Sequence, residues 1–162
     1  MRGGPESWNI RACHMADAGM VNVGQLPRER HAAEGVVLVG FGSHEGTVIA
    51  AQQWGMPPET MEVPPARDGS VEDLLHRALP GGSALFVWED GGEAAPAWRR
   101  EEFDHRAIGV VYRPQAERWG NYVPTVLADR YDAFLYLDRT RALTPHRYEH
   151  GTGEEETYPT GQ

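Results

Sequence analysis

Lysine is missing from this sequence: all 15 basic residues are arginine, against 24 acidic residues in a chain of 162. Its absence excludes a Schiff-base lysine, a lysine general base and the lysine of a phosphate-binding P-loop. The formal net charge of −9 argues against nucleic acid as a partner, because binding to phosphates depends on clustered cationic side chains. We therefore expect no nucleic-acid partner.

Cysteine is nearly absent as well. Cys13 is the only one, so no disulfide can form within the chain, and zinc sites of the Cys₂His₂ or Cys₄ type are excluded. No other pattern for a metal or an organic cofactor is found, and we expect neither.

Long apolar runs are also lacking. No stretch approaches the roughly 20 apolar residues of a membrane span, and the first residues carry no apolar core of a signal peptide. We expect a single cytoplasmic domain without a membrane segment, because a chain of 162 residues fits one domain with its own core. Residues 1–6 and 146–162 hold few apolar side chains, so we expect a flexible lead and a disordered tail around a domain of residues 7–145.

Four short apolar runs are typical of strands, and none is joined to the next by a two-residue hairpin turn. This arrangement predicts an α/β fold with a layered, mostly parallel sheet and flanking helices. The ligand site of such a sheet lies at the carboxyl ends of its strands. The expected strands are residues 36–41, 84–88, 107–112 and 133–137.

One helix has clear start and stop signals. Ser70 and Asp73 form a capping-box-like start to a helix that begins at Val71, and Pro80 ends it. The preceding residues 55–70 contain four prolines in sixteen positions, so we expect a loop there.

The stretch VVLVGFGSHEGTVIAAQQWG, from Val36 to Gly55, places a histidine and a glutamate between glycines at the expected functional edge. Its spacing fits neither the dinucleotide fingerprint G-x-G-x-x-G nor the nucleophile elbow G-x-S-x-G, in which His44 would take the place of the serine. His44 and Glu45 remain candidate catalytic residues, because imidazole titrates near neutrality. Neighbours in an extended segment point to opposite sides, so the two are not expected to act as a direct dyad. The alternative for His44 is an exposed turn histidine.

His105 and Arg106, directly before the third expected strand, are candidate substrate-binding residues. For Arg106, a salt bridge is the alternative interpretation. Neither His44 nor His105 has an evident carboxylate partner in the sequence that would fix its tautomer.

Several segments, read in order, resemble the carboxyl-terminal part of the erythromycin esterase family, from about residue 7 to residue 145. They are SWNIRACHMA, GMVNVGQLPRER, VVLVGFGSHEGTVIAAQQWG, HRAIGVVYRPQAERWGNYVPTVL and YDAFLYLDRTRAL. The resemblance implies a three-layer α/β fold and hydrolysis of a carboxylic ester, with macrolide lactones as substrates of some members and antibiotic resistance as the result. It also implies an activated water without a metal, a histidine as general base, and nearby carboxylate and arginine groups.

The sequence departs from the family pattern in two places. The stretch of the type G-E-x-x-H-G, which supplies the base histidine, has no counterpart here, and the A-H-N-x-H stretch is absent near Asp17. Arg11 matches the pattern and is a candidate substrate-binding residue, although Ala12 stands where the pattern has an acidic residue. We therefore expect a truncated, internally deleted relative. It would act on a small-molecule ester only if a complementing chain or self-association supplies the missing elements.

Two other functions stay open on the sequence alone. One is a non-catalytic remnant or interaction module, and the other is a small α/β domain that binds an anion through backbone N–H groups of the glycine-rich turn. The three readings differ in whether an ester is turned over and in whether an anion is bound.

Overall fold

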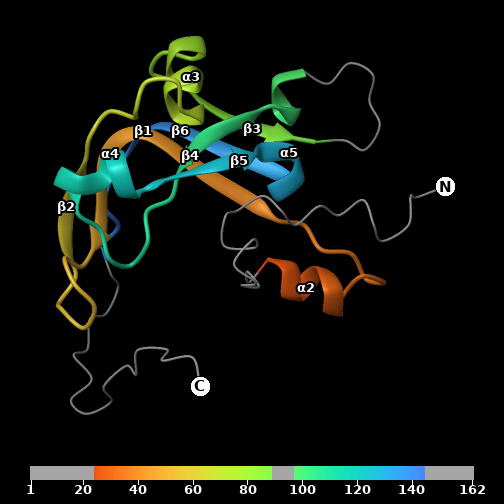
Figure 1. The fold of residues 1–162 in the computed structure, drawn as a ribbon, viewed down its shortest axis with the longest axis horizontal. Helices are drawn as coiled ribbons and strands as arrows, with labels where there is room; N and C mark the ends of the chain where they lie inside the picture. The colour runs from red at the N-terminus through yellow and green to blue at the C-terminus, as the bar shows by residue number, and fades with distance from the viewer. Residues whose placement is uncertain (1–23, 89–96, 145–162) are drawn as a thin grey trace.

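The computed structural model describes residues 24–88 and 97–144 (Figure 1). The helices are α2 (Gln25–Arg30), α3 (Val71–Ala78), α4 (Glu117–Gly120) and α5 (Leu127–Arg130), with 3₁₀ turns at Ala97–Arg100 and Pro114–Ala116. The strands are β1 (Val39–Ala50), β2 (Glu59–Val63), β3 (Ser83–Val87), β4 (Glu102–Arg106), β5 (Tyr122–Val126) and β6 (Ala133–Thr140). Arg11, the expected lead at 1–6 and the expected tail at 146–162 lie outside the described residues.

The strands form a mixed sheet, which corrects the expectation of a mostly parallel one. Its order is β2-β1-β6-β3, in which only β1 and β6 run parallel, and β4 and β5 form a separate antiparallel pair. The class is α/β with few helices. Figure 1 shows α3 on one side of the sheet, where β4 and β5 also cross in front of β1. No helix among the described residues is long and apolar enough to cross a membrane.

Strand β1 is much longer than the expected strand at residues 36–41, and it runs straight through the glycine-rich stretch. Pairing begins at Val39 and continues to Ala50, so the GSHEG segment is part of a strand and not a turn after one. Two glycines make this possible. A Cβ at Gly42 would lie 2.6 Å from Cζ of Phe134, and Gly46 has φ +139°, a conformation that residues with side chains rarely adopt.

The proline-rich segment at 55–70 is not a continuous loop, because Glu59–Val63 forms β2 on the sheet edge. Its prolines flank the strand, where the missing N–H groups do not interrupt the hydrogen-bonding ladder. Met61 and Val63 point inward and form a small core with Ala50 and Tyr112. Burial of these side chains holds the edge strand in place.

The expected strand at residues 107–112 is wrong. The paired strand is the preceding polar segment β4, and of 107–112 only Val111 makes a bridge, to Ala51. Tyr112 is nevertheless buried, so the apolar run serves the core through its side chains rather than through strand pairing.

Helix α3 forms as its capping signals predict. The Ser70 hydroxyl accepts a hydrogen bond from the Asp73 N–H at 3.3 Å, and the helix ends at the residue before Leu79. Val71 and Leu75 pack on Phe134 of β6, forming the main core. The strands expected at 84–88 and 133–137 are also confirmed, as β3 and as the first part of β6.

The opposite face of the sheet is uncovered by the described residues. In the strand register, Phe41 of β1 and Leu85 of β3 flank Leu135, while Val39 and Val87 flank Ala133. Four of these side chains, Val39, Phe41, Leu85 and Val87, are between 45% and 63% exposed. We call them the open face. A parallel strand pair is usually buried on both sides, so this exposure is unusual.

Candidate functional site

A pocket of about 460 Å³ lies where β1 passes β4 and the end of α5. Its volume falls within the range of small-molecule sites, about 300–1,000 Å³. The polar residues in its wall are Ser43, His105, Arg106, Arg130, Tyr131 and Thr140. Two of the predicted site residues, His105 and Arg106, are therefore brought together here, whereas His44 and Glu45 are not among the lining residues.

His105 ends β4 and is only 3% exposed. Its Nδ1 lies 2.6 Å from Oε1 of Glu72, a fully buried carboxylate in the first turn of α3. Its Nε2 lies 3.4 Å from the hydroxyl of Tyr131. The carboxylate holds the proton on Nδ1, so in the neutral ring Nε2 is the acceptor that faces Tyr131. This is the geometry of an oriented imidazole that takes up or returns a proton.

The Glu72 partner was missed at the sequence level, where His105 seemed to lack a carboxylate. Glu72 lies 33 residues away, on a helix rather than beside the strand. One feature of the sequence indicated a buried Glu72: it lies two residues after the Ser70 cap, beside residues that face the core. A glutamate facing inward there requires a buried partner.

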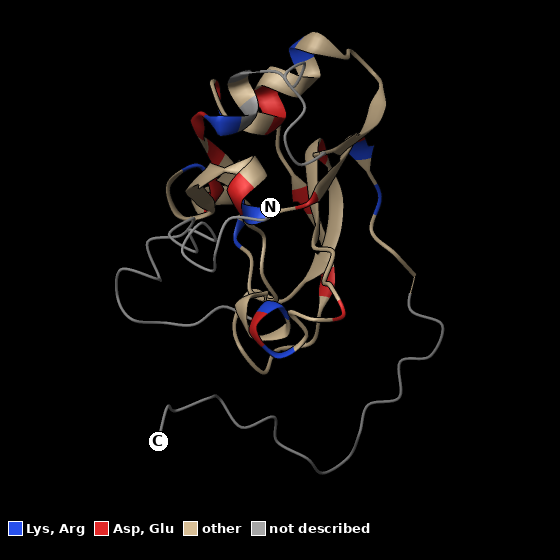
Figure 2. Ribbon diagram, turned by 90° about the vertical axis from the view of Figure 1, so that its right-hand side faces the viewer, with Lys and Arg blue, Asp and Glu red and all other residues tan. Residues whose placement is uncertain are grey.

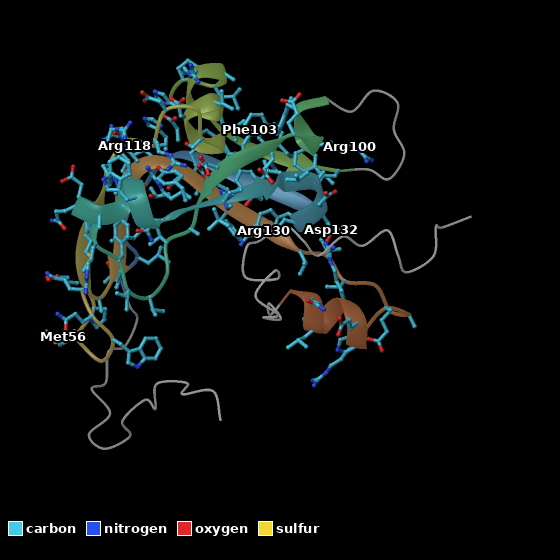
Figure 3. All side chains as sticks on the ribbon, viewed as in Figure 1. Met56, Arg100, Phe103, Arg118, Arg130 and Asp132 are labelled. Atoms are coloured by element: carbon cyan, nitrogen blue, oxygen red, sulfur yellow. The ribbon has the colours of Figure 1, made fainter. Side chains whose placement is uncertain are left out.

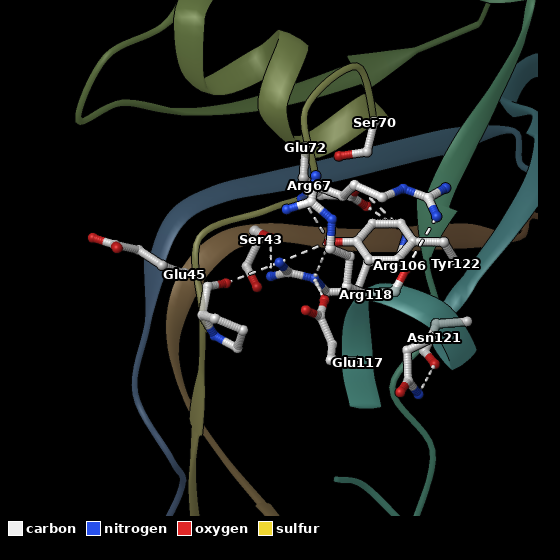
Figure 4. Close-up of polar contacts among 12 residues, drawn as sticks. Ser43, Glu45, Arg67, Ser70, Glu72, Arg106, Glu117, Arg118, Asn121 and Tyr122 are labelled. Carbon is white, nitrogen blue, oxygen red and sulfur yellow. Dashed lines mark hydrogen bonds and ion pairs between the residues drawn. The ribbon is translucent and has the colours of Figure 1, made fainter. Parts of the chain in front are cut away.

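Arg106 confirms the salt-bridge interpretation. Its Nε lies 2.6 Å from Oε1 of Glu117, and the two side chains are 3% and 4% exposed. Its terminal nitrogens donate to the carbonyls of Ser43, His44 and Pro64 at 2.9–3.1 Å and to the Tyr122 hydroxyl (Figure 4). With these bonds, Arg106 joins β4 to β1 and to the chain after β2. It positions the pocket wall and has little capacity left for a ligand.

His44 lies in the middle of β1 and is 8% exposed, which corrects the interpretation as an exposed turn residue. Its ring stacks on His76 of α3, with centroids 3.7 Å apart and planes 8° from parallel. His76 in turn lies 2.6 Å from Asp138. His44 Nδ1 has no hydrogen-bond partner among the described residues. Burial, and then the neighbouring His76, hold the pKa of His44 below its usual value.

Glu45 forms an ion pair with Arg139 of β6. Because its neighbour His44 faces α3 instead, the two side chains contact different groups and do not form a dyad. Their alternation is that of an ordinary extended strand.

The low pKa of His44 predicts a pH-dependent stability. Between its lowered folded-state pKa and the ordinary value of 6.5, the unfolded chain binds more protons than the folded one, so the free energy of unfolding rises with pH. Each such proton contributes a slope of at most about 1.4 kcal/mol per pH unit. We expect His44→Gln to flatten the slope just below pH 6.5, measured by urea unfolding at stepped pH.

The matched control is His31→Gln, which removes an exposed histidine. Other groups face His44, namely His76, Asp138, Glu45 and Arg106. Burial alone would raise the pKa of Asp138, but hydrogen bonds from His76 and Tyr136 hold it below its ordinary 3.8, so its contribution is lost only as pH falls further. An unchanged slope near pH 6 in His44→Gln would contradict the assignment.

A family model for erythromycin esterase matches residues 5–140. The chain belongs to the erythromycin esterase family. Among solved structures, a succinoglycan biosynthesis protein superposes with a TM-score of 0.58 at 20% identity, covering 75% of this chain. A Bacillus cereus protein superposes with a TM-score of 0.54 at 13% identity, covering 73%. At these identities the matches establish the fold alone.

The chain spans 28% of the length of each of these two solved proteins. It therefore corresponds to part of each of these two larger folds. The pocket around His105 and the open face both lie within the residues that the family model matches.

Proposed function

We propose that this chain forms part of a carboxylic ester hydrolase of the erythromycin esterase type, with macrolide lactones as the candidate substrates. The match of the family model over residues 5–140 carries the proposal. The pocket adds support, because it combines an imidazole oriented by a buried carboxylate with apolar and cationic walls.

Within this chain, the geometry favours His105 over His44 for contact with substrate. His105 lines the pocket and its Nε2 faces the Tyr131 hydroxyl, whereas His44 packs against His76 beneath α3. Glu72 is then a positioning residue for His105. Arg106 holds the wall, and Glu45, which pairs with Arg139, is not assigned a role in the reaction.

The chain by itself is proposed to be inactive on macrolides. Ester hydrolysis by an activated water gains about 10²- to 10⁴-fold from a positioned base and about 10²- to 10³-fold from each preset oxyanion donor. The G-E-x-x-H-G and A-H-N-x-H stretches that the family pattern contains are absent from this sequence. The open face on β1 and β3 supports a need for a complementing polypeptide or a second copy, because it leaves apolar side chains in water.

Incubation of the purified chain with erythromycin, followed by mass spectrometry, tests this. We expect no lactone opening above background, although slow hydrolysis of a simple activated ester is compatible with surface imidazoles. Macrolide turnover that disappears in His105→Gln or His44→Ala would show that the chain is active alone.

A chimera tests the positive part of the proposal. Residues 36–140 replace the aligned segment of a family member that opens macrolide lactones. We expect the chimera to keep measurable lactone hydrolysis and His105→Gln within it to lower kcat, with Arg118→Gln, an exposed position in the same segment that does not line the pocket, as the control. A folded chimera without activity would contradict the assignment of this segment to the hydrolase.

A further inference from the structure

The pocket beside β4 has no acidic side chain in its wall, although Glu117 and Glu72 behind the wall pair with Arg106 and His105. The sequence has 24 acidic and 15 basic residues, yet the pocket is lined by two arginines and a histidine and by no aspartate or glutamate. Figure 2 shows acidic residues on many elements of the fold, and none is among the residues that line this pocket. A ligand with negative charge fits such a wall.

Of the two arginines, Arg130 is the one available to a ligand. Arg106 is bound by Glu117 and three backbone carbonyls. Arg130, at the end of α5, donates one hydrogen bond to Thr125 at 3.1 Å, and among the ion pairs of the described residues none includes it. Figure 3 shows Arg130 next to β5, and Arg130 is among the residues that line the pocket.

An aromatic ring and an imidazole lie beside Arg130. Its guanidinium carbon lies 5.3 Å from the centre of the Tyr131 ring, and the Tyr131 hydroxyl is directed to Nε2 of His105 at 3.4 Å. The buried Glu72 lies on the other side of that imidazole, at Nδ1. An anion beside Arg130 therefore meets the guanidinium before it meets any carboxylate.

The rest of the wall selects an organic anion over an inorganic one. Val48, Ile108 and Leu137, together with the exposed Phe41 of the open face, give the pocket an apolar side, and its volume of about 460 Å³ is larger than a bare phosphate needs. Arginine forms paired hydrogen bonds with a planar carboxylate.

We propose that this pocket binds a small carboxylic acid, with Arg130 holding the carboxylate and the apolar wall holding its hydrocarbon body. The proposal names the class of ligand that the pocket binds. It rests on the proposed function in one respect: a carboxylic acid is one product of ester hydrolysis. The acid can bind to the pocket even if the chain hydrolyses no ester.

Titration calorimetry at pH 7 with hexanoate as the probe tests the proposal, with hexanamide as the neutral match and inorganic phosphate as the simple anion. We expect hexanoate to bind, and hexanamide to bind at least about tenfold more weakly, because it lacks the charge that strengthens a hydrogen bond to arginine. Phosphate should also bind at least about tenfold more weakly, because it has no hydrocarbon body to bury against the apolar wall. Arg130→Gln should weaken hexanoate by at least about tenfold, whereas Arg130→Lys should restore only part of the affinity, because lysine keeps the charge but cannot form the paired hydrogen bonds.

The control Arg118→Gln removes the same charge from an exposed position that does not line the pocket. Thermal melts confirm that each variant is folded. Equal binding of hexanoate and hexanamide, equal binding of phosphate, or hexanoate affinity unchanged in Arg130→Gln would each overturn the proposal. If the chimera hydrolyses lactones but the chain does not bind hexanoate, the carboxylate site is wrong and the hydrolase assignment is kept. If the chain binds hexanoate but the chimera does not hydrolyse lactones, the hydrolase assignment is wrong and the carboxylate site is kept.

Discussion

Arg106→Met should destabilise the fold by about 3–5 kcal/mol, the usual result of removing one member of a buried ion pair. The substitution leaves Glu117 charged and 4% exposed, and it leaves the carbonyls of Ser43, His44 and Pro64 without their donor. Because single domains are stable by only about 5–15 kcal/mol in total, this loss is a large fraction of the free energy of unfolding. Urea denaturation followed by tryptophan fluorescence measures the change.

The control is Arg77→Met, which breaks the i,i+4 pair with Asp73 on α3, where the arginine side chain is 61% exposed. Exposed pairs of this kind contribute about 0–1 kcal/mol. The double variant Arg106→Met with Glu117→Gln should recover part of the loss, because it removes the unpaired charge. Equal effects of Arg106→Met and Arg77→Met would show that the Arg106 network adds little to stability.

Gly46→Ala should also destabilise the fold strongly, by about 2–6 kcal/mol. Gly46 has φ +139°, and a Cβ there would overlap the backbone carbonyl of Thr140, its partner in the pairing of β1 with β6. The strained conformation accounts for about 1–3 kcal/mol, and the overlap for about 1–3 kcal/mol more. The backbone of Thr140 cannot give way without loss of the strand pairing.

Gly120→Ala provides the matched control. Gly120 ends α4 without a positive φ, and nothing lies within 4 Å of the position its Cβ would take. Alanine there should be neutral or stabilising by up to about 1 kcal/mol. Thermal unfolding measures the stability of both variants. A Gly46→Ala protein with the same melting temperature as the parent chain would mean that β1 does not pair through Gly46.

Parts of the fold with local signals were predictable from the sequence. The Ser70 cap and the following apolar residues specify α3, and the runs at 84–88 and 133–137 become β3 and most of β6. The apolar run at 107–112 has the same local pattern and yet does not pair as a strand. Apolar content predicts burial, but a backbone partner at the right distance decides whether a strand forms.

The candidate site was predictable only in part. His105 and Arg106 could be selected as polar residues beside an apolar run, and an ion pair for Arg106 could be expected, since a buried arginine requires a partner. Which carboxylates serve them could not be foreseen: Glu72 comes from a helix and Glu117 from a short turn of helix. Such pairings depend on contacts between distant segments.

By itself, the sequence determined the chemistry that is excluded, from the absence of lysine and of a second cysteine, and the family to which the chain belongs. It also determined those helices and strands whose capping residues and apolar pattern lie within a few residues of one another. The tertiary structure alone decided that β1 continues through its glycines and that His44 faces α3 while His105 faces the pocket. The physical reason is that strand register and side-chain direction are set by pairing with β6 and packing on α3, both far away in the sequence.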